Sequence, residues 1–389
     1  MISGGQCGDW QLKILILHRK DIANLEAGGG TLYIHRVAKY LVQKGHKVTL
    51  MCANYSKSKK EENIDGVNIL RIGTKHSVFF LAPFHYFRRF RKKMDVLIDV
   101  MNGPPWFSPL YSNVPKIAVI FQVFREVFLA ELNKPLAFLT ILAEKTAPLL
   151  YRNMTVVTLS PSVKMELVNM GFSEKNVLVI PPGIDLRKYQ PGGKSTLPLV
   201  LYVGRLKRYK GVEFLILAMK DVVKRIPKAK LLIAGKGDYV GELIRLTERL
   251  GLKSVVSFCG YVSEERKIEL MQKAHVIVIP SVMEGWGIPI IEAAACGTPA
   301  IGTDTLGLKD TIVNGKTGFL VSYGESEILA EKIIEILEND DLRNKLSKNV
   351  TEWARNFEWK KTEQEFLCLI ENISDSSKLS NNLAELEGR

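Results

Sequence analysis

Two glutamates separated by seven residues occupy a stretch that is typical of a loop leading into a helix. They are Glu284 and Glu292 in the segment MEGWGIPIIEAAACG, residues 283–297. Gly285 and Gly287 carry no side chain, so a ligand can approach the loop backbone closely. A helix N-terminus binds anions such as a diphosphate, and the two carboxylates can accept sugar or ribose hydroxyls. The alternative is an ordinary strand–loop–helix crossover with solvated glutamates.

The local pattern predicts where this helix begins and ends. Pro289 suits the first helical position, because its ring fixes the backbone dihedral and its missing N–H costs nothing there. Gly297 follows the apolar run as a C-terminal cap. This prediction places Glu284 in the loop and Glu292 in the first turn of the helix.

A basic loop, GRLKRYKG at residues 204–211, follows the apolar run LVLYV. In parallel sheets, ligands bind at the carboxyl ends of the strands. The planar guanidinium of Arg205 and the flexible ammonium of Lys210 together suit a diphosphate and its departing charge. A solvated basic loop is the alternative. Because the GxxxxGK[ST] pattern is absent, the loop does not indicate P-loop nucleotide hydrolysis.

Apolar runs alternate with helical patterns along the chain. Continuous apolar strands in such an alternation imply parallel sheets covered by helices on both faces. The helix after the first strand should be capped by Thr31 and run to about Lys44, and a last helix should span 359–373 before a polar tail. Strands are expected at residues 13–18, 47–52, 68–72, 96–100, 117–121, 155–159, 177–180, 199–203, 230–234, 255–259, 276–280, 300–303 and 319–321.

The alternation pauses at a polar, turn-rich linker around residues 185–195 and then starts afresh. The predicted fold class is therefore α/β, with two Rossmann-like, doubly wound parallel-sheet domains facing each other across a cleft. The expected domains comprise residues 1–190 and 191–355, followed by a helical segment at 356–389.

The composition limits the classes of protein to which the chain can belong. With 389 residues, 46% hydrophobic and 24% charged, the chain is typical of a soluble globular protein of two domains. No run approaches the roughly 20 apolar residues that cross a bilayer, and residues 1–9 lack the apolar core of a signal peptide. The cysteines are odd in number and lack CxxC spacing, which argues against a disulfide framework and a zinc site and indicates a reducing cytoplasm. They are Cys7, Cys52, Cys259, Cys296 and Cys368.

The net charge of +13 is concentrated in the first half of the chain. Residues 1–192 hold 26 Lys and Arg against 14 Asp and Glu, whereas the remainder holds 28 against 27. This asymmetry indicates an anionic partner for the first half, which is a nucleic acid, an acidic substrate or a membrane surface.

One segment of this half, residues 84–94, interleaves aromatic and basic side chains. Phe84, Phe87 and Phe90 recur every three residues, so a helix would present them on one face beside cations, as at an anionic membrane surface. The alternative is a helix that packs its aromatic residues on the core. Nucleic acid is a poorer partner, because no nucleic-acid-binding fold accompanies the patch. The predicted membrane-binding residues are Phe87, Arg88, Arg89, Phe90, Arg91, Lys92 and Lys93.

The basic loop and the glutamate pair, taken together, resemble a known family. The pattern GR-x4-KG is followed about 75 residues later by EGWGIPIIEAAACGTPAIG. This combination is similar to the retaining glycosyltransferases of family four, which have the GT-B fold, and the similarity covers the chain after residue 12. Supporting motifs are IPPGID at 180–185, AGKG at 234–237, FCGYV at 258–262 and NGKTGFLV at 314–321.

The resemblance implies a site for a UDP- or GDP-linked sugar in the second domain and an acceptor site in the first. Arg205 and Lys210 would hold the diphosphate and offset its charge. Glu292 would bind the ribose, and Glu284 would face the donor sugar. The implied catalytic residues are Arg205, Lys210 and Glu284. The implied donor-binding residues are Gly28, Gly29, Gly30, Gly204, Gly235, Gly237, Tyr261, Gly285, Trp286, Gly287, Ile288 and Glu292.

The chemistry fits these residue types. Glycosyl transfer develops negative charge on the departing diphosphate, so the protein's main tasks are positioning and leaving-group stabilisation. Two cations and a helix N-terminus can supply this without a divalent metal, and the cleft loops show no DxD-like motif. The resemblance thus implies a retaining, metal-independent hexosyltransferase of glycan biosynthesis without a cofactor. Both same-face attack and a covalent intermediate are compatible with retention.

The expected acceptor is a glycan or a lipid-linked molecule, and the expected location is cytoplasmic, with peripheral binding at the inner face of the membrane. One departure from the family concerns the first domain. Many members carry a histidine just after the strand equivalent to 117–121, where this chain has Gln122 and Arg125. The resemblance also implies that the last helix packs back on the first domain.

Other functions fit parts of this pattern. The alternatives are a non-catalytic nucleotide-sugar-binding module, and an epimerase or phosphorylase of the same fold. A dinucleotide-dependent dehydrogenase is disfavoured, because the first strand of neither domain is followed by GxGxxG.

Overall fold

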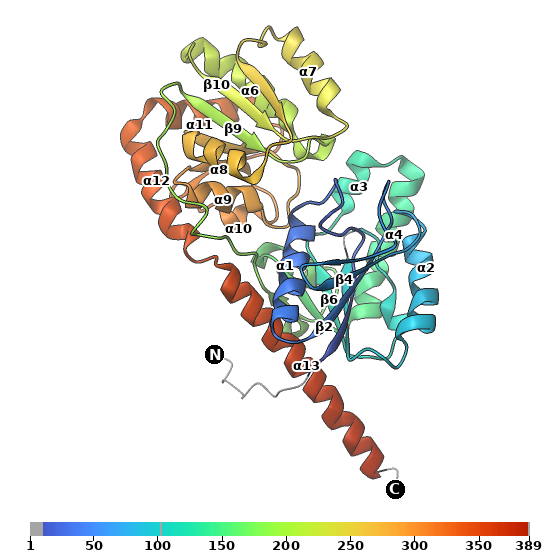
Figure 1. Ribbon diagram of the computed structural model, residues 1–389. Helices are drawn as coiled ribbons and strands as arrows, with labels where there is room; N and C mark the ends of the chain where they lie inside the picture. Colours follow the sequence, from blue (N-terminus) through green and yellow to red (C-terminus); the bar gives the residue numbers. More distant parts are fainter. Residues whose placement is uncertain (1–10, 102, 388–389) are drawn as a thin grey trace.

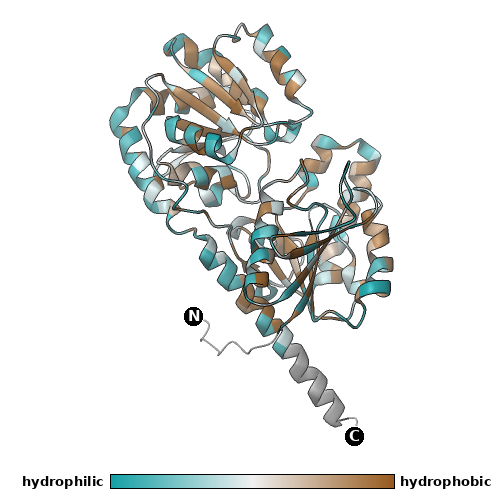
Figure 2. Ribbon diagram, viewed as in Figure 1, coloured by the Kyte–Doolittle hydropathy of each residue, from teal (hydrophilic) through white to brown (hydrophobic). Residues whose placement is uncertain are grey.

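The computed structural model describes residues 11–101 and 103–387. They form two α/β domains, drawn one above the other in Figure 1, and a long C-terminal helix that runs along the lower domain. The strands at the centre of each domain are hydrophobic, whereas hydrophilic residues cover much of the outer helices (Figure 2). Two separate sheets therefore organise the chain, as the alternation of apolar runs predicts.

The first domain holds the first eight strands of the chain. They are β1 (Lys13–Leu17), β2 (Lys47–Cys52), β3 (Glu61–Ile64), β4 (Val67–Arg71), β5 (Val96–Met101), β6 (Lys116–Ile120), β7 (Thr155–Thr158) and β8 (Val177–Val179). Its helices are α1 (Gly29–Gln43), α2 (Val78–His85), the π-helix η1 (Tyr86–Phe90), α3 (Arg125–Glu131), α4 (Lys134–Tyr151) and α5 (Pro161–Asn169), with short 3-10 turns η2 (Ser108–Leu110) and η3 (Glu174–Asn176).

The second domain holds the remaining six strands. They are β9 (Leu199–Val203), β10 (Lys230–Ala234), β11 (Val256–Gly260), β12 (Val276–Ile279), β13 (Ala300–Thr303) and β14 (Gly318–Val321). The helices are α6 (Val212–Arg225), α7 (Val240–Arg249), α8 (Glu264–Lys273), α9 (Ile288–Ala295), α10 (Leu308–Thr311), α11 (Ser326–Glu338) and α12 (Asp340–Ala354), with the 3-10 turn η4 (Arg208–Lys210). The last helix, α13, spans Trp359–Glu387.

Both sheets are doubly wound. The first has the order β3-β4-β2-β1-β5-β6-β7-β8 and is parallel except where β3 pairs with β4. The second has the order β11-β10-β9-β12-β13-β14 and its pairings are parallel. The winding direction reverses between β1 and β5 and between β9 and β12. Ligands bind outside the carboxyl ends of the strands at such reversals, which directs attention to the loops after β1, β9 and β12.

The two faces of the first sheet are covered by different helices. Ile14 of β1 joins the core cluster under α1, whereas Leu15 joins the cluster under α2. Leu15 pairs with Leu97 of β5, and Asp99, two residues further along β5, accepts a 2.7 Å hydrogen bond from Tyr151 of α4. Because residues two apart on a strand share a face, α2 and α4 cover the same side of the sheet.

The chain crosses between the domains twice, at one place. Ile184 and Glu358 form a parallel β-bridge, and the Ile184 N–H donates to the Phe357 carbonyl over 2.8 Å. A Cβ on Gly183 would lie 2.1 Å from the Trp359 nitrogen, so only glycine permits this crossing. After it, Trp359 and Phe366 of α13 pack near Tyr33 of α1, with ring centroids 6.2 and 6.3 Å apart.

The structure corrects several expectations of local structure. The antiparallel edge strand β3 was not predicted, because its sequence EENI lacks apolar alternation. The first helix begins at Gly29 with Gly28 as N-cap, and Thr31 is buried inside it instead of capping it. The last helix continues to Glu387 instead of ending at residue 373.

The basic segment at 84–94 is not one regular helix. The π-helix η1 follows α2, and Lys92 then adopts a left-handed φ of 61°. The wider π turn rotates Phe90 into the core beside Tyr86, whereas Phe84 and Phe87 stay exposed. The prediction that Phe90 shares an exposed face with Phe87 is therefore wrong.

Within the described residues, no helix is long and apolar enough to cross a membrane. The four cysteines described, from Cys52 to Cys368, are free thiols, and Cys7 lies outside the described residues, as does the N-terminal stretch examined for a signal peptide.

Candidate functional site

The predicted site residues of the second domain gather at the carboxyl edge of its sheet. The basic loop at 204–211 follows β9, and the glycine-rich loop at 281–287 follows β12, the strand beside it. The tip of the first loop lies close to the base of the second, since a Cβ on Gly211 would lie 2.2 Å from the Pro280 carbonyl oxygen. Gly211 has a φ of 62°, so glycine is required both for its backbone conformation and for this approach.

Lys210 and Glu284 form an ion pair between these two loops. Both side chains are largely buried, and Lys210 also lies over the Tyr209 ring, 4.8 Å from its centroid. The Ser281 hydroxyl donates a second hydrogen bond to Glu284, over 2.9 Å. The structure thus brings together two of the three predicted catalytic residues and holds the Glu284 carboxylate in a fixed orientation.

Arg205, the third predicted catalytic residue, is exposed at the mouth of the cleft. Its Nη2 donates to the Tyr209 hydroxyl over 2.9 Å, and no carboxylate pairs with it in the described part of the chain. Its positive charge is therefore exposed and has no acidic partner among the described residues.

Glu292 belongs to a buried network at the start of the second domain. Its Oε1 accepts hydrogen bonds from the Tyr189 hydroxyl at 3.0 Å and from Lys267 Nζ at 2.8 Å. Burial of Tyr189, with Glu292 next to it, raises the pKa of the Tyr189 hydroxyl, so it stays a donor. The sequence predicts Glu292 in the first turn of this helix. Because α9 begins at Ile288, Glu292 lies in its second turn instead.

The remaining donor-site glycines are fixed by backbone packing. A Cβ on Gly235 would lie 1.8 Å from the Gly204 carbonyl oxygen, and one on Gly237 would lie 1.8 Å from that of Leu206. These glycines therefore let the loop after β10 lie directly against the basic loop. Tyr261, at the end of β11, is exposed, and Lys236 lies 5.5 Å from its ring centroid.

Trp286 differs from its neighbours in the glycine-rich loop. Its side chain is buried and packs edge-on against Phe357, with ring centroids 5.2 Å apart. The side chain therefore connects the loop to the interdomain crossing. Gly287, beside it, has a φ of 86° and serves as the N-cap of α9.

The first domain closes over these loops through its own glycines. A Cβ on Gly28 would lie 3.9 Å from Arg205 Nε, and one on Gly29 would lie 2.8 Å from Ile288 Cδ1. Gly30 packs against the ring of Phe121, whose carbonyl oxygen in turn faces Gly285. The three consecutive glycines at 28–30 therefore lie against both sides of the predicted diphosphate site.

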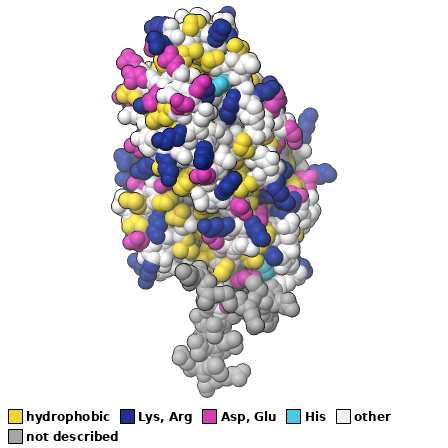
Figure 3. All heavy atoms as spheres, turned by 90° about the vertical axis from the view of Figure 1, so that its left-hand side faces the viewer, with side chains coloured by type: hydrophobic (Ala, Val, Ile, Leu, Met, Phe, Trp, Pro, Cys, Tyr) yellow, Lys and Arg dark blue, Asp and Glu magenta, His cyan; other side chains and the backbone are white. Residues whose placement is uncertain are grey.

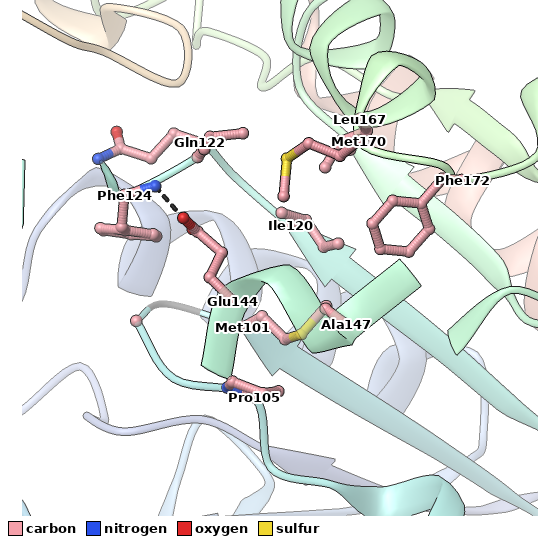
Figure 4. A pocket seen from close by; sticks show the side chains of 12 residues that line it. Met101, Pro105, Ile120, Gln122, Phe124, Glu144, Ala147, Leu167, Met170 and Phe172 are labelled. Carbon is pink, nitrogen blue, oxygen red and sulfur yellow. Dashed lines mark hydrogen bonds between the residues drawn. The ribbon is translucent and has the colours of Figure 1, made fainter. Parts of the chain in front are cut away.

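The position where family members carry a histidine lies at the edge of an apolar hollow. Figure 4 shows Gln122 with its amide directed away from Met170 and Phe172, and Glu144 accepting a hydrogen bond from the Phe124 N–H, over 2.7 Å. The hollow lies between β5, β6, α4 and α5, and its apolar lining includes Met101, Ile120, Val123, Leu167, Met170 and Phe172. Arg125 is exposed at the start of α3.

Other residues at the site carried no recognisable sequence signal. Glu131 of α3 accepts from the Tyr209 N–H over 3.4 Å and lies 3.9 Å from Lys207. Ser162 of α5 bonds to Asp310 of α10, and its hydroxyl accepts from the Gly307 N–H over 2.9 Å. These contacts join the two domains, and a single sequence does not reveal which loops of separate domains meet.

The arrangement combines cations, helix-terminal N–H groups and fixed carboxylates where loops of the two domains meet. Such a set can bind a diphosphate, hold a ribose and a sugar, and stabilise charge on a departing anion. Among the residues described, no three His, Cys, Asp or Glu side chains gather as metal ligands would.

Comparison with known proteins agrees with this arrangement. Residues 27–188 match the family described as Glycosyltransferase Family 4, and residues 186–353 match the family described as Glycosyl transferases group 1. An uncharacterized glycosyltransferase of Methanocaldococcus jannaschii is 28% identical over 352 residues, which span 83% of this chain and 88% of that protein.

Solved structures share the fold. Sucrose-phosphate synthase from Thermosynechococcus elongatus has a TM-score of 0.80 and 23% identity, covering 94% of this chain and all of that one. Anabaena HepE in complex with UDP-glucose has a TM-score of 0.75 and 18% identity, covering 93% of this chain and 100% of that one. The predicted GT-B fold is confirmed by these similarities.

Proposed function

Since the chain belongs to the glycosyltransferases, with a family 4 region followed by a group 1 region, we propose that it is a retaining hexosyltransferase. It transfers a sugar from a nucleotide diphosphate donor to an acceptor hydroxyl. The observation that carries the proposal is the position of Arg205, Lys210 and Glu284 around the N-terminus of α9, in loops that follow adjacent strands. No cofactor is required in this scheme.

The donor's diphosphate lies between the basic loop and the N-terminus of α9. Arg205 supplies a planar guanidinium that has no carboxylate partner in the described chain, and Lys210 supplies an ammonium. As the bond between sugar and phosphate breaks, these groups offset the charge that develops on the diphosphate. A divalent metal is not needed for this step, because two cations and the helix N-terminus supply the positive charge.

The nucleoside lies beyond the diphosphate. Glu292 binds the ribose hydroxyls, held by Tyr189 and Lys267 through Oε1, and exposed Tyr261 stacks near the base. UDP and GDP both suit this site. UDP-glucose, bound in the HepE structure, is the first donor to test.

Retention follows from attack on the face from which the diphosphate departs. Glu284 is paired with Lys210 and bonded by Ser281, so it is poorly suited to form a covalent intermediate. In this scheme Glu284 orients a hydroxyl of the donor sugar, and the acceptor hydroxyl arrives from the first domain near Gln122.

The acceptor is a glycan or lipid-linked molecule at the inner face of a membrane. Exposed Phe84 and Phe87 lie beside the basic residues of η1 and its C-terminal turn. Leu136, Phe138 and Leu139 of α4 are also exposed, on the helix that covers the same side of the sheet. Exposed apolar groups beside cations suit an anionic bilayer surface.

A panel of UDP- and GDP-sugars with simple acceptor glycosides tests the reaction itself. Mass spectrometry should detect an acceptor heavier by one sugar, and the proton NMR coupling at the new anomeric carbon should match that of the donor. Inversion would contradict retention. Tight nucleotide-sugar binding without product across the panel would favour the non-catalytic module, and an altered free sugar would favour an epimerase.

A further inference from the structure

Arg19 is a cation of the first domain that the scheme above does not use. It follows β1, at the point where the winding of the first sheet reverses. Its main-chain carbonyl accepts from the Ala53 N–H over 3.2 Å, which fixes the backbone beside the cleft. The side chain is half-buried, and its Nε is enclosed without a hydrogen-bond partner.

The guanidinium of Arg19 has neither an ion pair nor a side-chain hydrogen bond within residues 11–101 and 103–387. The nearby carboxylate of Glu26 pairs instead with Lys20, at 2.7 Å. A buried guanidinium N–H without a partner is costly, because each lost hydrogen bond to water is left uncompensated. Protein groups alone therefore leave Arg19 incompletely satisfied.

Arg19 also lies close enough to Arg205 of the second domain for the two charges to interact. Burial lowers the pKa of the Arg19 guanidinium, and the charge of Arg205 lowers it further. Burial likewise lowers the pKa of Lys20, and Arg19 and Arg205 add to the effect. Glu26 offsets part of this repulsion, but its carboxylate is paired with Lys20. A bound anion would offset the repulsion between the like charges of the two domains more fully.

The loop that carries Arg19 also lies against Arg205. A Cβ on Gly28, in the same loop after β1 as Arg19, would lie 3.9 Å from Arg205 Nε. A Cβ on Gly103 would lie 3.9 Å from Arg19 Nη1. A glycine therefore lies beside each guanidinium group, and neither glycine has a side chain that could cover the charge.

We propose that Arg19 and Arg205 bind one phosphate group together, so that this phosphate joins the two domains. Planar guanidinium groups bind phosphate oxygens in pairs, and burial strengthens that attraction. The proposal rests on the proposed function, in which Arg205 contacts the donor. The phosphate has two possible sources, which are the donor diphosphate and a phosphate group on the acceptor.

Binding measurements on the full chain distinguish these sources. Isothermal titration calorimetry should compare wild type with Arg19→Gln for UDP, GDP, the matching nucleosides and inorganic pyrophosphate. A phosphorylated sugar should then be titrated into protein saturated with the nucleotide that binds more tightly. If the phosphate is the donor's, Arg19→Gln should weaken nucleotide and pyrophosphate binding at least tenfold while leaving nucleoside binding unchanged. If the phosphate belongs to the acceptor, Arg19→Gln should weaken only the binding of the sugar phosphate.

Matched variants separate the outcomes. Arg152→Gln makes the same change before β7, at the amino ends of the strands, whereas Arg19 follows β1 at their carboxyl ends. This variant should bind every ligand as wild type does. Wild-type affinity of Arg19→Gln for all of these ligands would overturn the proposal. If Arg205→Gln also bound nucleotides normally, the donor site itself would be misassigned, which is a different failure.

A folding control keeps the test decisive. Removing a like charge should leave the melting temperature of ligand-free Arg19→Gln equal to or above that of wild type, while reducing the rise that pyrophosphate produces. Should that variant not fold, Arg19→Lys keeps the charge but loses the planar fork. Unchanged phosphate affinity in Arg19→Lys would then count against the proposal.

Discussion

Lys210 and Glu284 neutralise each other's charge in an ion pair, and this pairing affects what each side chain can do when a ligand binds. A cation paired with a carboxylate lies ready at the site without repelling its neighbours, and it can turn toward a more highly charged phosphate when a donor binds. The carboxylate keeps its hydrogen bond from Ser281, so it remains oriented. In the proposed scheme, the pair links binding of the diphosphate to release of a carboxylate that can face the sugar.

Replacing Lys210 with Ala should lower kcat about 100- to 1,000-fold, because a positive group aimed at the leaving diphosphate is lost. The measurement is the initial rate with the best donor of the panel. Arg208→Ala, in the same loop but exposed, should retain most activity. A Lys210→Ala enzyme with normal turnover and an intact melting curve would remove the leaving-group role.

Asp99 should make the first domain more stable in acid than at neutral pH. Burial raises the pKa of Asp99 to about 6, despite hydrogen bonds from Ser108 and Tyr151. The folded protein therefore binds this proton more tightly than the unfolded chain does. This contribution is fully present below about pH 4 and is lost as pH rises to about 6, by up to about 3 kcal/mol.

Urea unfolding of Asp99→Asn and wild type between pH 4 and pH 7 measures this effect. The variant cannot ionise, so its free energy of unfolding should rise relative to wild type across that window. Asp95→Asn, on the exposed turn before β5, supplies the control. A difference between Asp99→Asn and wild type that is independent of pH would exclude the assigned protonation.

At the scale of elements, the central strands were predictable and the edges were not. Buried parallel strands such as β1, β9 and β12 are continuous apolar runs, and their observed bounds lie within two residues of those expected. The edge strand β3 has one face toward water and a polar sequence, so no periodicity marks it. Helix α1 begins in glycines, which carry no capping side chain to read.

The same limits apply to the site. Arg205, Lys210, Glu284 and Glu292 could be predicted as site residues because they belong to motifs that follow β9 and β12. Arg19 follows β1 without a motif, and only its closeness to Arg205 of the other domain suggested the role proposed for it. The π-helix at Tyr86 also has no sequence signature, and it decides which aromatic side chains of the basic segment are exposed.

The two surface elements proposed to contact a membrane can be tested separately. Replacing Leu136, Phe138, Leu139 and Leu142 of α4 with Ser should reduce sedimentation with phosphatidylglycerol vesicles, because exposed apolar area is lost. Replacing Arg88, Arg89, Arg91, Lys92 and Lys93 with Ala should reduce it as well, and more so at low salt.

Exposed apolar residues of the second domain provide the matched control. Ile244→Ser and Ile328→Ser remove exposed apolar side chains from α7 and α11 and should leave binding unchanged. Equal sedimentation of wild type and both first-domain variants would eliminate the membrane hypothesis. Binding to neutral phosphatidylcholine at the same level would eliminate its electrostatic part.

At the scale of the whole molecule, polar contacts join the two domains outside the crossing, in addition to the packing of residues 28–30 against the second domain. Ser162 of α5 and Asp310 of α10 form one such contact, and Glu131 with the basic loop forms another. On the face that carries α12 and α13, basic and acidic side chains are interspersed (Figure 3). This face therefore shows no concentration of positive charge.

Removing the Asp310 carboxylate should favour an open arrangement. Hydrogen bonds to a charged group contribute about 1–2 kcal/mol, so Asp310→Ala should raise KM for the donor about five- to thirtyfold with little change in kcat. Small-angle X-ray scattering of the ligand-free protein should show a larger radius of gyration. Asp341→Ala, on the outer helix α12, should change neither quantity, and a closed, wild-type profile for Asp310→Ala would refute this role.

The double crossing at Gly183 and Trp359 also sets how this chain can be recombined with its relatives. The first domain is not contiguous in sequence, because α13 covers α1 after the chain has already built the second domain. A chimera that exchanges the second domain therefore needs two junctions, one in each of the two chain segments that form the crossing. Its C-terminal helix must come from the parent that supplies the first domain, since Tyr33 packs on Trp359 and Phe366. If the second domain binds the donor and the first binds the acceptor, as proposed, donor preference can be transplanted as an insert, whereas acceptor preference requires both ends of the chain.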